Sequence, residues 1–68
     1  MLEDKVLDYI KQNNKAYTKT MYVTLDVKKS YRMSLNKFRL FLQELDKQEK
    51  IKEVFTDKYS YWSINHAK

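Results

Sequence analysis

The chain of 68 residues contains no cysteine, no proline and no glycine, and its single histidine is His66. Without cysteine there is no disulfide framework, and a zinc finger would lack its thiolate ligands. Without glycine the chain has neither the loops that cradle nucleotide phosphates nor the sharp turn that presents a catalytic serine. One histidine is too few for a histidine-based metal site or catalytic relay. We therefore expect no metal, no cofactor, no catalytic residue and no enzymatic activity.

Long apolar runs are also absent, so the sequence predicts neither a secretion signal nor a membrane-spanning segment. We expect a cytoplasmic, intracellular protein without a membrane partner. The length allows one domain, which spans residues 1–68 and ends in a frayed tail at residues 65–68. Aromatic residues make up 15% of the chain, and these large side chains can build a small core without disulfides.

Acidic side chains are scarce in the middle of the chain. Residues 15–39 hold a single acid, Asp26, whereas the whole chain has a formal net charge of +5. The cations of this stretch are Lys15, Lys19, Lys28, Lys29, Arg32, Lys37 and Arg39. Positive charge that gathers on one part of an otherwise balanced domain is typical of proteins that bind polyanions, and nucleic acid is the commonest such partner.

Helical spacing of apolar residues predicts two clear helices. The first covers residues 2–13, with Leu2, Val6 and Ile10 on one face and a stop at Asn13-Asn14, where asparagine tolerates a left-handed conformation. The second begins after the N-cap Ser34 and runs to about residue 50. Its core face holds Leu35, Phe38, Phe41, Leu42 and Leu45, and its opposite face holds Asn36, Arg39, Leu40, Gln43 and Lys47.

Residues 18–31 are compatible with two structures. Met21, Val23 and Leu25 alternate as in a strand, and local propensity favours that reading. A helix capped by Thr18 or Thr20 would instead place Met21 and Leu25 on one face.

Two short strands, residues 51–55 and 59–64, are predicted to form a hairpin whose tip is Thr56-Asp57-Lys58. Trp62 and Ile64 would point into the core, whereas Tyr59 and Tyr61 would lie on the opposite face.

This order of elements resembles the winged helix-turn-helix domain. Leu42, Leu45 and Ile51 match the apolar positions that close the recognition helix and open the wing. The ending Tyr61-Trp62-Ser63-Ile64 is similar to the return strand of many such domains, including small fimbrial phase-variation regulators. The glycine that usually precedes the wing is replaced here by Glu49 or Lys50. The resemblance implies a small α+β fold of three helices followed by a two-stranded wing, with residues 18–31 helical.

The resemblance further implies that the helix after Ser34 lies in the major groove of double-stranded DNA. Base contacts are then expected from Ser34, Asn36, Lys37 and Leu40. Asn36 suits adenine, Lys37 suits guanine or a phosphate, and Leu40 can contact a thymine methyl group. The same polar residues would also serve simply to solvate an exposed helix face.

Phosphate contacts are expected on either side of that helix. The set comprises Lys28, Lys29, Tyr31, Arg32 and Arg39, together with Lys58 and Tyr59 at the tip of the wing. Residues 28–39 contain no acid, which favours a phosphate-binding role over a loop kept basic for solubility.

The function expected from these features is that of a non-enzymatic DNA-binding protein. It would regulate transcription or DNA maintenance for a virus, plasmid or other mobile element, and would be nucleoid-associated when bound. Two alternatives remain open. Exposed tyrosines would allow the chain to bind single-stranded nucleic acid by stacking. Alternatively, the basic face and Leu40 would dock a protein partner, and Leu40 with the outer aromatic residues of the hairpin would form a homodimer contact.

Overall fold

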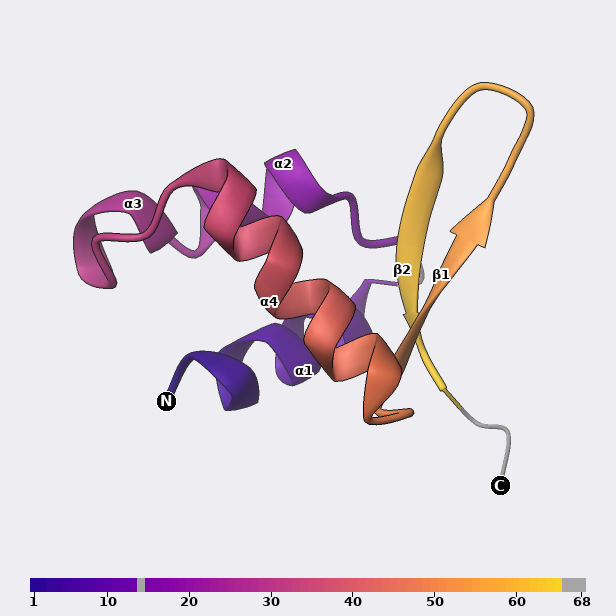
Figure 1. Cartoon of the computed structure of the whole chain (residues 1–68), viewed down its shortest axis with the longest axis horizontal. Coiled ribbons are helices and arrows are strands. Elements are labelled where there is room, and N and C mark those ends of the chain that lie inside the picture. The colour runs from indigo at the N-terminus through magenta and orange to yellow at the C-terminus, as the bar shows by residue number, and fades with distance from the viewer. Residues whose placement is uncertain (14, 66–68) are drawn as a thin grey trace.

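The computed structural model describes residues 1–13 and 15–65, so the expected tail at residues 66–68 and the predicted stop at Asn14 lie outside the described residues. It is a small α+β domain in which helices precede a two-stranded antiparallel hairpin (Figure 1). The elements are α1 (Leu2–Gln12), α2 (Thr18–Thr24), α3 (Val27–Ser30), α4 (Leu35–Lys47), β1 (Ile51–Phe55) and β2 (Ser60–Ile64). None of the helices in residues 1–13 and 15–65 has the length and apolar character needed to span a lipid bilayer.

Helix α1 confirms the predicted amphipathic pattern, because Leu2, Val6 and Ile10 are buried. Its end differs from the prediction. Asn13 is extended, with φ −124° and ψ 109°, and its side-chain amide donates to the carbonyl oxygen of Tyr9 over 2.8 Å. Asn13 therefore ends the helix in an extended conformation and not a left-handed one, and both its backbone N–H and its side-chain amide donate to the Tyr9 carbonyl oxygen.

The ambiguous segment is helical but broken. Helix α2 ends before Asp26, which has a positive φ of 51°, and α3 follows directly. Strand propensity is overridden because this arrangement buries Met21 and Val27 completely in the core. The expectation of a threonine cap is wrong, since the N-cap is Tyr17 and no side chain caps α2.

Helix α4 follows the sequence prediction closely. The Ser34 hydroxyl accepts a hydrogen bond from the backbone N–H of Lys37 at 3.2 Å, as expected for an N-cap. Phe38, Leu42 and Leu45 are buried, and the half-buried Phe41 packs beside them. The helix ends three residues earlier than predicted, at Lys47.

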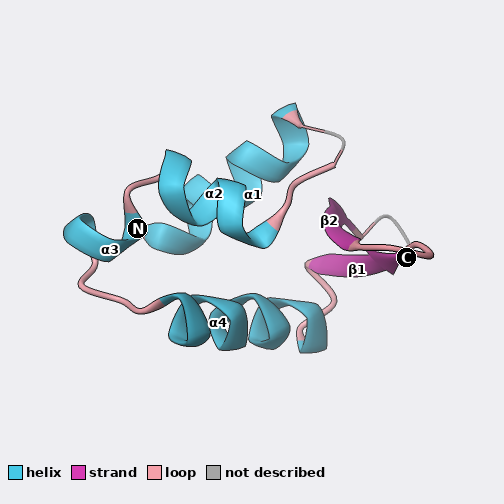
Figure 2. Ribbon diagram, turned by 90° about the horizontal axis from the view of Figure 1, so that it is seen from above, coloured by secondary structure: helices cyan, strands magenta, loops and turns pink. Residues whose placement is uncertain are grey.

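The hairpin has the register Ile51↔Ile64, Glu53↔Trp62 and Phe55↔Ser60. A third segment joins it, because Ala16 and Trp62 form an isolated antiparallel bridge with N···O distances of 3.3 and 2.7 Å. The helices lie on one side of this small sheet (Figure 2). At the end of β2, the N–H of Asn65 donates to the Lys50 carbonyl oxygen at 3.3 Å, so the frayed tail predicted for residues 65–68 does not include Asn65.

Trp62 connects the sheet to the helices. The indole is 1% exposed, and its Nε1 donates to Thr18 Oγ1 at 2.8 Å. Buried side chains from α1 to α4, β1 and β2 form one core, which confirms that Trp62 points inward. Ile64 is half-buried and packs against the same core.

The exit from α4 shows which residue replaces the expected glycine. Glu49 adopts φ 62°, its N–H donates to the Asp46 carbonyl oxygen, and the N–H of Lys50 donates to that of Leu45. These are the bonds of a Schellman motif, in which the left-handed position favours glycine.

Replacing Glu49 by glycine is expected to raise the free energy of unfolding by about 0.5–1 kcal/mol, because the Cβ atom is disfavoured at this φ. Chemical denaturation followed by circular dichroism measures the change. Lys47→Gly, two residues earlier and inside the last turn of α4, is the control and should lower stability by about 1 kcal/mol. Destabilisation by both substitutions would show that the left-handed conformation is not what limits stability here.

Candidate nucleic-acid interface

One face of α4 is turned away from the core. Asn36, Lys37, Arg39 and Leu40 are all exposed, and the Leu40 side chain retains 62% of its accessible surface. The exposed face assigned from the helical spacing is therefore confirmed, but Leu35, expected on the core face, is only half-buried and lines a surface depression beside Ser34. A capped helix that projects amide, cationic and apolar groups from its first two turns has the dimensions and chemistry to contact base edges in a major groove.

The start of α4 adjoins the basic segment. Lys28 and Arg32 line a shallow depression of about 440 Å³ together with Ser34 and Leu35. The segment that leads into α4 is tied to α2, because the Tyr22 hydroxyl donates a hydrogen bond to the Met33 carbonyl oxygen at 2.7 Å. Arg32 itself has a positive φ of 50°, and this turn brings residues of α3 next to the N-terminus of α4.

The cations of this region are electrostatically uncompensated. In residues 1–13 and 15–65 the ion pair that forms is Lys50 Nζ to Glu3 Oε2 at 2.6 Å, which ties α1 to the exit of α4. None of the cations that precede or begin α4 takes part in an ion pair within that part of the chain; these are Lys28, Lys29, Arg32 and Lys37. Their charge is therefore available to an external anion.

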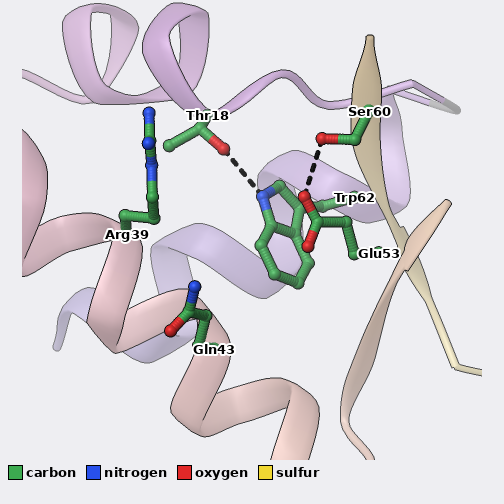
Figure 3. Close-up of a pocket in the computed structure, with 6 residues that line it drawn as sticks. All are labelled: Thr18, Arg39, Gln43, Glu53, Ser60 and Trp62. Carbon is green, nitrogen blue, oxygen red and sulfur yellow. Dashed lines mark hydrogen bonds between the residues drawn. The ribbon is translucent and has the colours of Figure 1, made fainter. Parts of the chain in front are cut away.

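Arg39 faces a different neighbour. With Gln43 it lines a polar pocket of about 200 Å³ between α4, the start of α2 and the inner face of the hairpin (Figure 3). Across this pocket the Ser60 hydroxyl donates to Glu53 Oε2 at 2.7 Å. Arg39 is exposed, so its guanidinium can reach a ligand that enters between α4 and the hairpin.

The remaining phosphate candidates lie apart from this group. Lys58 and Tyr59 belong to the tip of the hairpin, at the opposite end of the molecule from α3 (Figure 1). Tyr31 is half-buried, and the ammonium of Lys5 lies 5.7 Å from the centroid of its ring. The structure thus brings Lys28, Arg32 and Ser34 together, but it places the wing tip elsewhere.

Sequence reasoning missed part of this surface. Gln43 lies one turn after Arg39 and shares its pocket, and Thr18 reaches the same pocket from α2. Helical spacing already places Gln43 on the same face as Arg39, but it does not indicate that the two share a pocket. Thr18 was not, because its position depends on the contact between α2 and Trp62.

We compared the chain with models of protein families, with curated proteins and with solved structures, and found no match in any of the three.

Proposed function

We propose that this domain is a winged helix-turn-helix protein that binds double-stranded DNA, with α4 in the major groove. The order of α1 to α4 followed by β1 and β2 supports the proposal. As a non-enzymatic binder it would regulate transcription or DNA maintenance, for a virus, plasmid or other mobile element, by occupying its site.

The observation that carries the proposal is the surroundings of the α4 N-terminus. An exposed helix start, capped by Ser34, projects Asn36 and Lys37, and the unpaired cations Lys28 and Arg32 border it. Groups that can discriminate bases therefore lie beside groups that can neutralise phosphates. That combination is what sequence-dependent binding to a duplex requires, because phosphate contacts orient the protein and base contacts select the site.

A salt titration tests the proposal. A fluorescent duplex of mixed sequence is titrated with the protein at several salt concentrations. If Lys28, Lys29, Arg32 and Lys37 each neutralise one phosphate, log Kobs should fall against log[salt] with a slope of about −3.6. Binding that does not depend on salt, or no binding at low salt, would contradict the proposal.

Removing the Asn36 amide separates base contact from phosphate contact. Asn36→Ala is expected to reduce discrimination among duplexes selected from a random library by about 1–3 kcal/mol at one base pair, because a bidentate amide contact is lost. The slope against salt should stay the same, since no charge changes. Gln12→Ala, at an exposed position at the end of α1, is the matched control and should leave the preferred site unaltered. Equal effects of the two variants would refute the role assigned to Asn36.

A further inference from the structure

The outer face of the sheet, turned away from the helices, carries three tyrosines. Trp62 and Ala16 face the core, so the residues beside them face outward because side chains alternate along extended segments. The register pairs Tyr61 with Val54 and Ser63 with Lys52 across the hairpin. The outer face therefore comprises Lys15, Tyr17, Lys52, Val54, Tyr59, Tyr61 and Ser63.

The three rings form one cluster. The Tyr17 ring lies edge-on to that of Tyr59, with centroids 5.5 Å apart, and edge-on to that of Tyr61, with centroids 6.2 Å apart. Partial burial and the neighbouring Tyr59 hydroxyl raise the pKa of Tyr17 above its ordinary value. Tyr59 is 47% exposed at the edge of the cluster and is available for further contact. The three rings therefore form one continuous aromatic surface on the outer face of the sheet.

Two lysines lie at one end of this cluster, level with Ser63. The Lys15 ammonium lies 5.7 Å from the Tyr61 ring centroid, which holds it above the sheet, and Lys52 is exposed on β1. The described residues of the outer face include no aspartate or glutamate. A second copy docked on the same face would bring like charges together, whereas a polyanion would meet complementary charge.

We propose that the outer face of the sheet binds single-stranded nucleic acid. An unpaired base stacks on Tyr59, and Lys15 and Lys52, which lie level with Ser63 at the other end of the cluster, meet phosphates further along the strand. The exposed ring of Tyr59 favours nucleic acid over an acidic peptide as the partner. An acidic peptide would need only the lysines, whereas an unpaired base also stacks on the aromatic ring. This surface is separate from α4, since the helices lie on the other side of the sheet (Figure 2). The inference therefore does not depend on duplex binding.

Fluorescence anisotropy with a labelled oligothymidylate of about ten nucleotides tests the site. Tyr59→Ala is expected to weaken binding about 5- to 150-fold, because one stacked base contributes about 1–3 kcal/mol. Tyr59→Phe keeps the ring and should bind like the parent. Phe55→Ala is the matched control: Phe55 is 75% exposed on the same hairpin but lies on the inner face, so its removal should not change the affinity.

Further measurements distinguish this site from other surfaces. Lys15→Gln should make the slope of log Kobs against log[salt] shallower by about 0.7. Lys28→Glu/Arg32→Glu, beside the start of α4, should leave the affinity for oligothymidylate nearly unchanged. This expectation holds whether or not the parent protein binds duplex DNA. Circular dichroism confirms that each variant is folded.

Three results would overturn the proposal. One is equal binding of oligothymidylate by the parent and Tyr59→Ala. Another is competition by polyglutamate at the same charge concentration, which would identify a general polyanion surface. The third is a parent dimer in analytical ultracentrifugation that Tyr59→Ala dissociates, which would identify a second copy as the occupant.

Discussion

The double variant Lys28→Glu/Arg32→Glu is expected to lose about 30-fold in affinity for duplex DNA at 0.15 M salt, and the slope against salt should become shallower by about 1.8. Both figures follow from the loss of two phosphate contacts, each of which releases close to one counterion. The structural reason is that Lys28 and Arg32 border the same depression beside the start of α4, so they meet the backbone on one side of the groove that α4 occupies. Filter binding or anisotropy across a salt series measures both quantities.

The matched control is Lys11→Glu/Lys52→Glu, at exposed positions at the end of α1 and on β1. Either double variant lowers the formal net charge from +5 to +1, so long-range attraction is reduced equally. Because neither Lys11 nor Lys52 lines the depression beside the start of α4, the control should retain most of its affinity and nearly the full slope. If the two double variants lose the same affinity for the duplex, and their salt slopes become equally shallow, then only net charge matters. The basic segment before α4 would have no particular role.

Trp62→Ala is expected to remove about 3–5 kcal/mol of stability, because the indole is buried and no neighbour can fill the space it leaves. A domain of this size derives only about that much from its core, so the variant should be largely unfolded at room temperature. Urea denaturation followed by far-ultraviolet circular dichroism measures the loss without relying on tryptophan fluorescence.

Two further variants divide this effect into packing and hydrogen bonding. Thr18→Val keeps the volume but leaves Nε1 of Trp62 without its acceptor, and should cost about 1–3 kcal/mol. Phe55→Ala truncates another aromatic side chain of the hairpin, but at an exposed position, and should change stability by less than about 0.5 kcal/mol. A Trp62→Ala variant as stable as Phe55→Ala would show that the indole is not the centre of the core.

The elements whose sequence signals are local were predicted well. The Ser34 cap and the spacing of Phe38, Leu42 and Leu45 determine α4 within a few residues, and alternation determines the two strands of the hairpin. The segment after Tyr17 was ambiguous because its local propensity and its tertiary environment disagree. Burial of Met21 and Val27 stabilises the helical structure over a strand. The break between α2 and α3 could not be predicted, because the left-handed residue there is Asp26 and not a glycine.

The candidate interface was predictable in composition but not in arrangement. Exposure of Asn36 and Leu40 follows from helical spacing alone. The proximity of Lys28 to the start of α4 depends on the left-handed conformation of Asp26 and Arg32. Nothing in the adjoining sequence predicts that conformation. The tyrosine cluster on the outer sheet face depends on the bridge between Ala16 and Trp62, which joins segments far apart in the chain.

That bridge also bears on how the protein is made. Trp62 is the last of the described buried residues to be synthesised, and its partners Ala16 and Thr18 have by then long left the ribosome. Until Trp62 emerges, α1 and α2 lack the side chain that closes the core between them and the sheet. Loop closure over this distance must precede the gain from packing. The core therefore cannot close until β2 is available, and cooperative folding depends on the synthesis of β2.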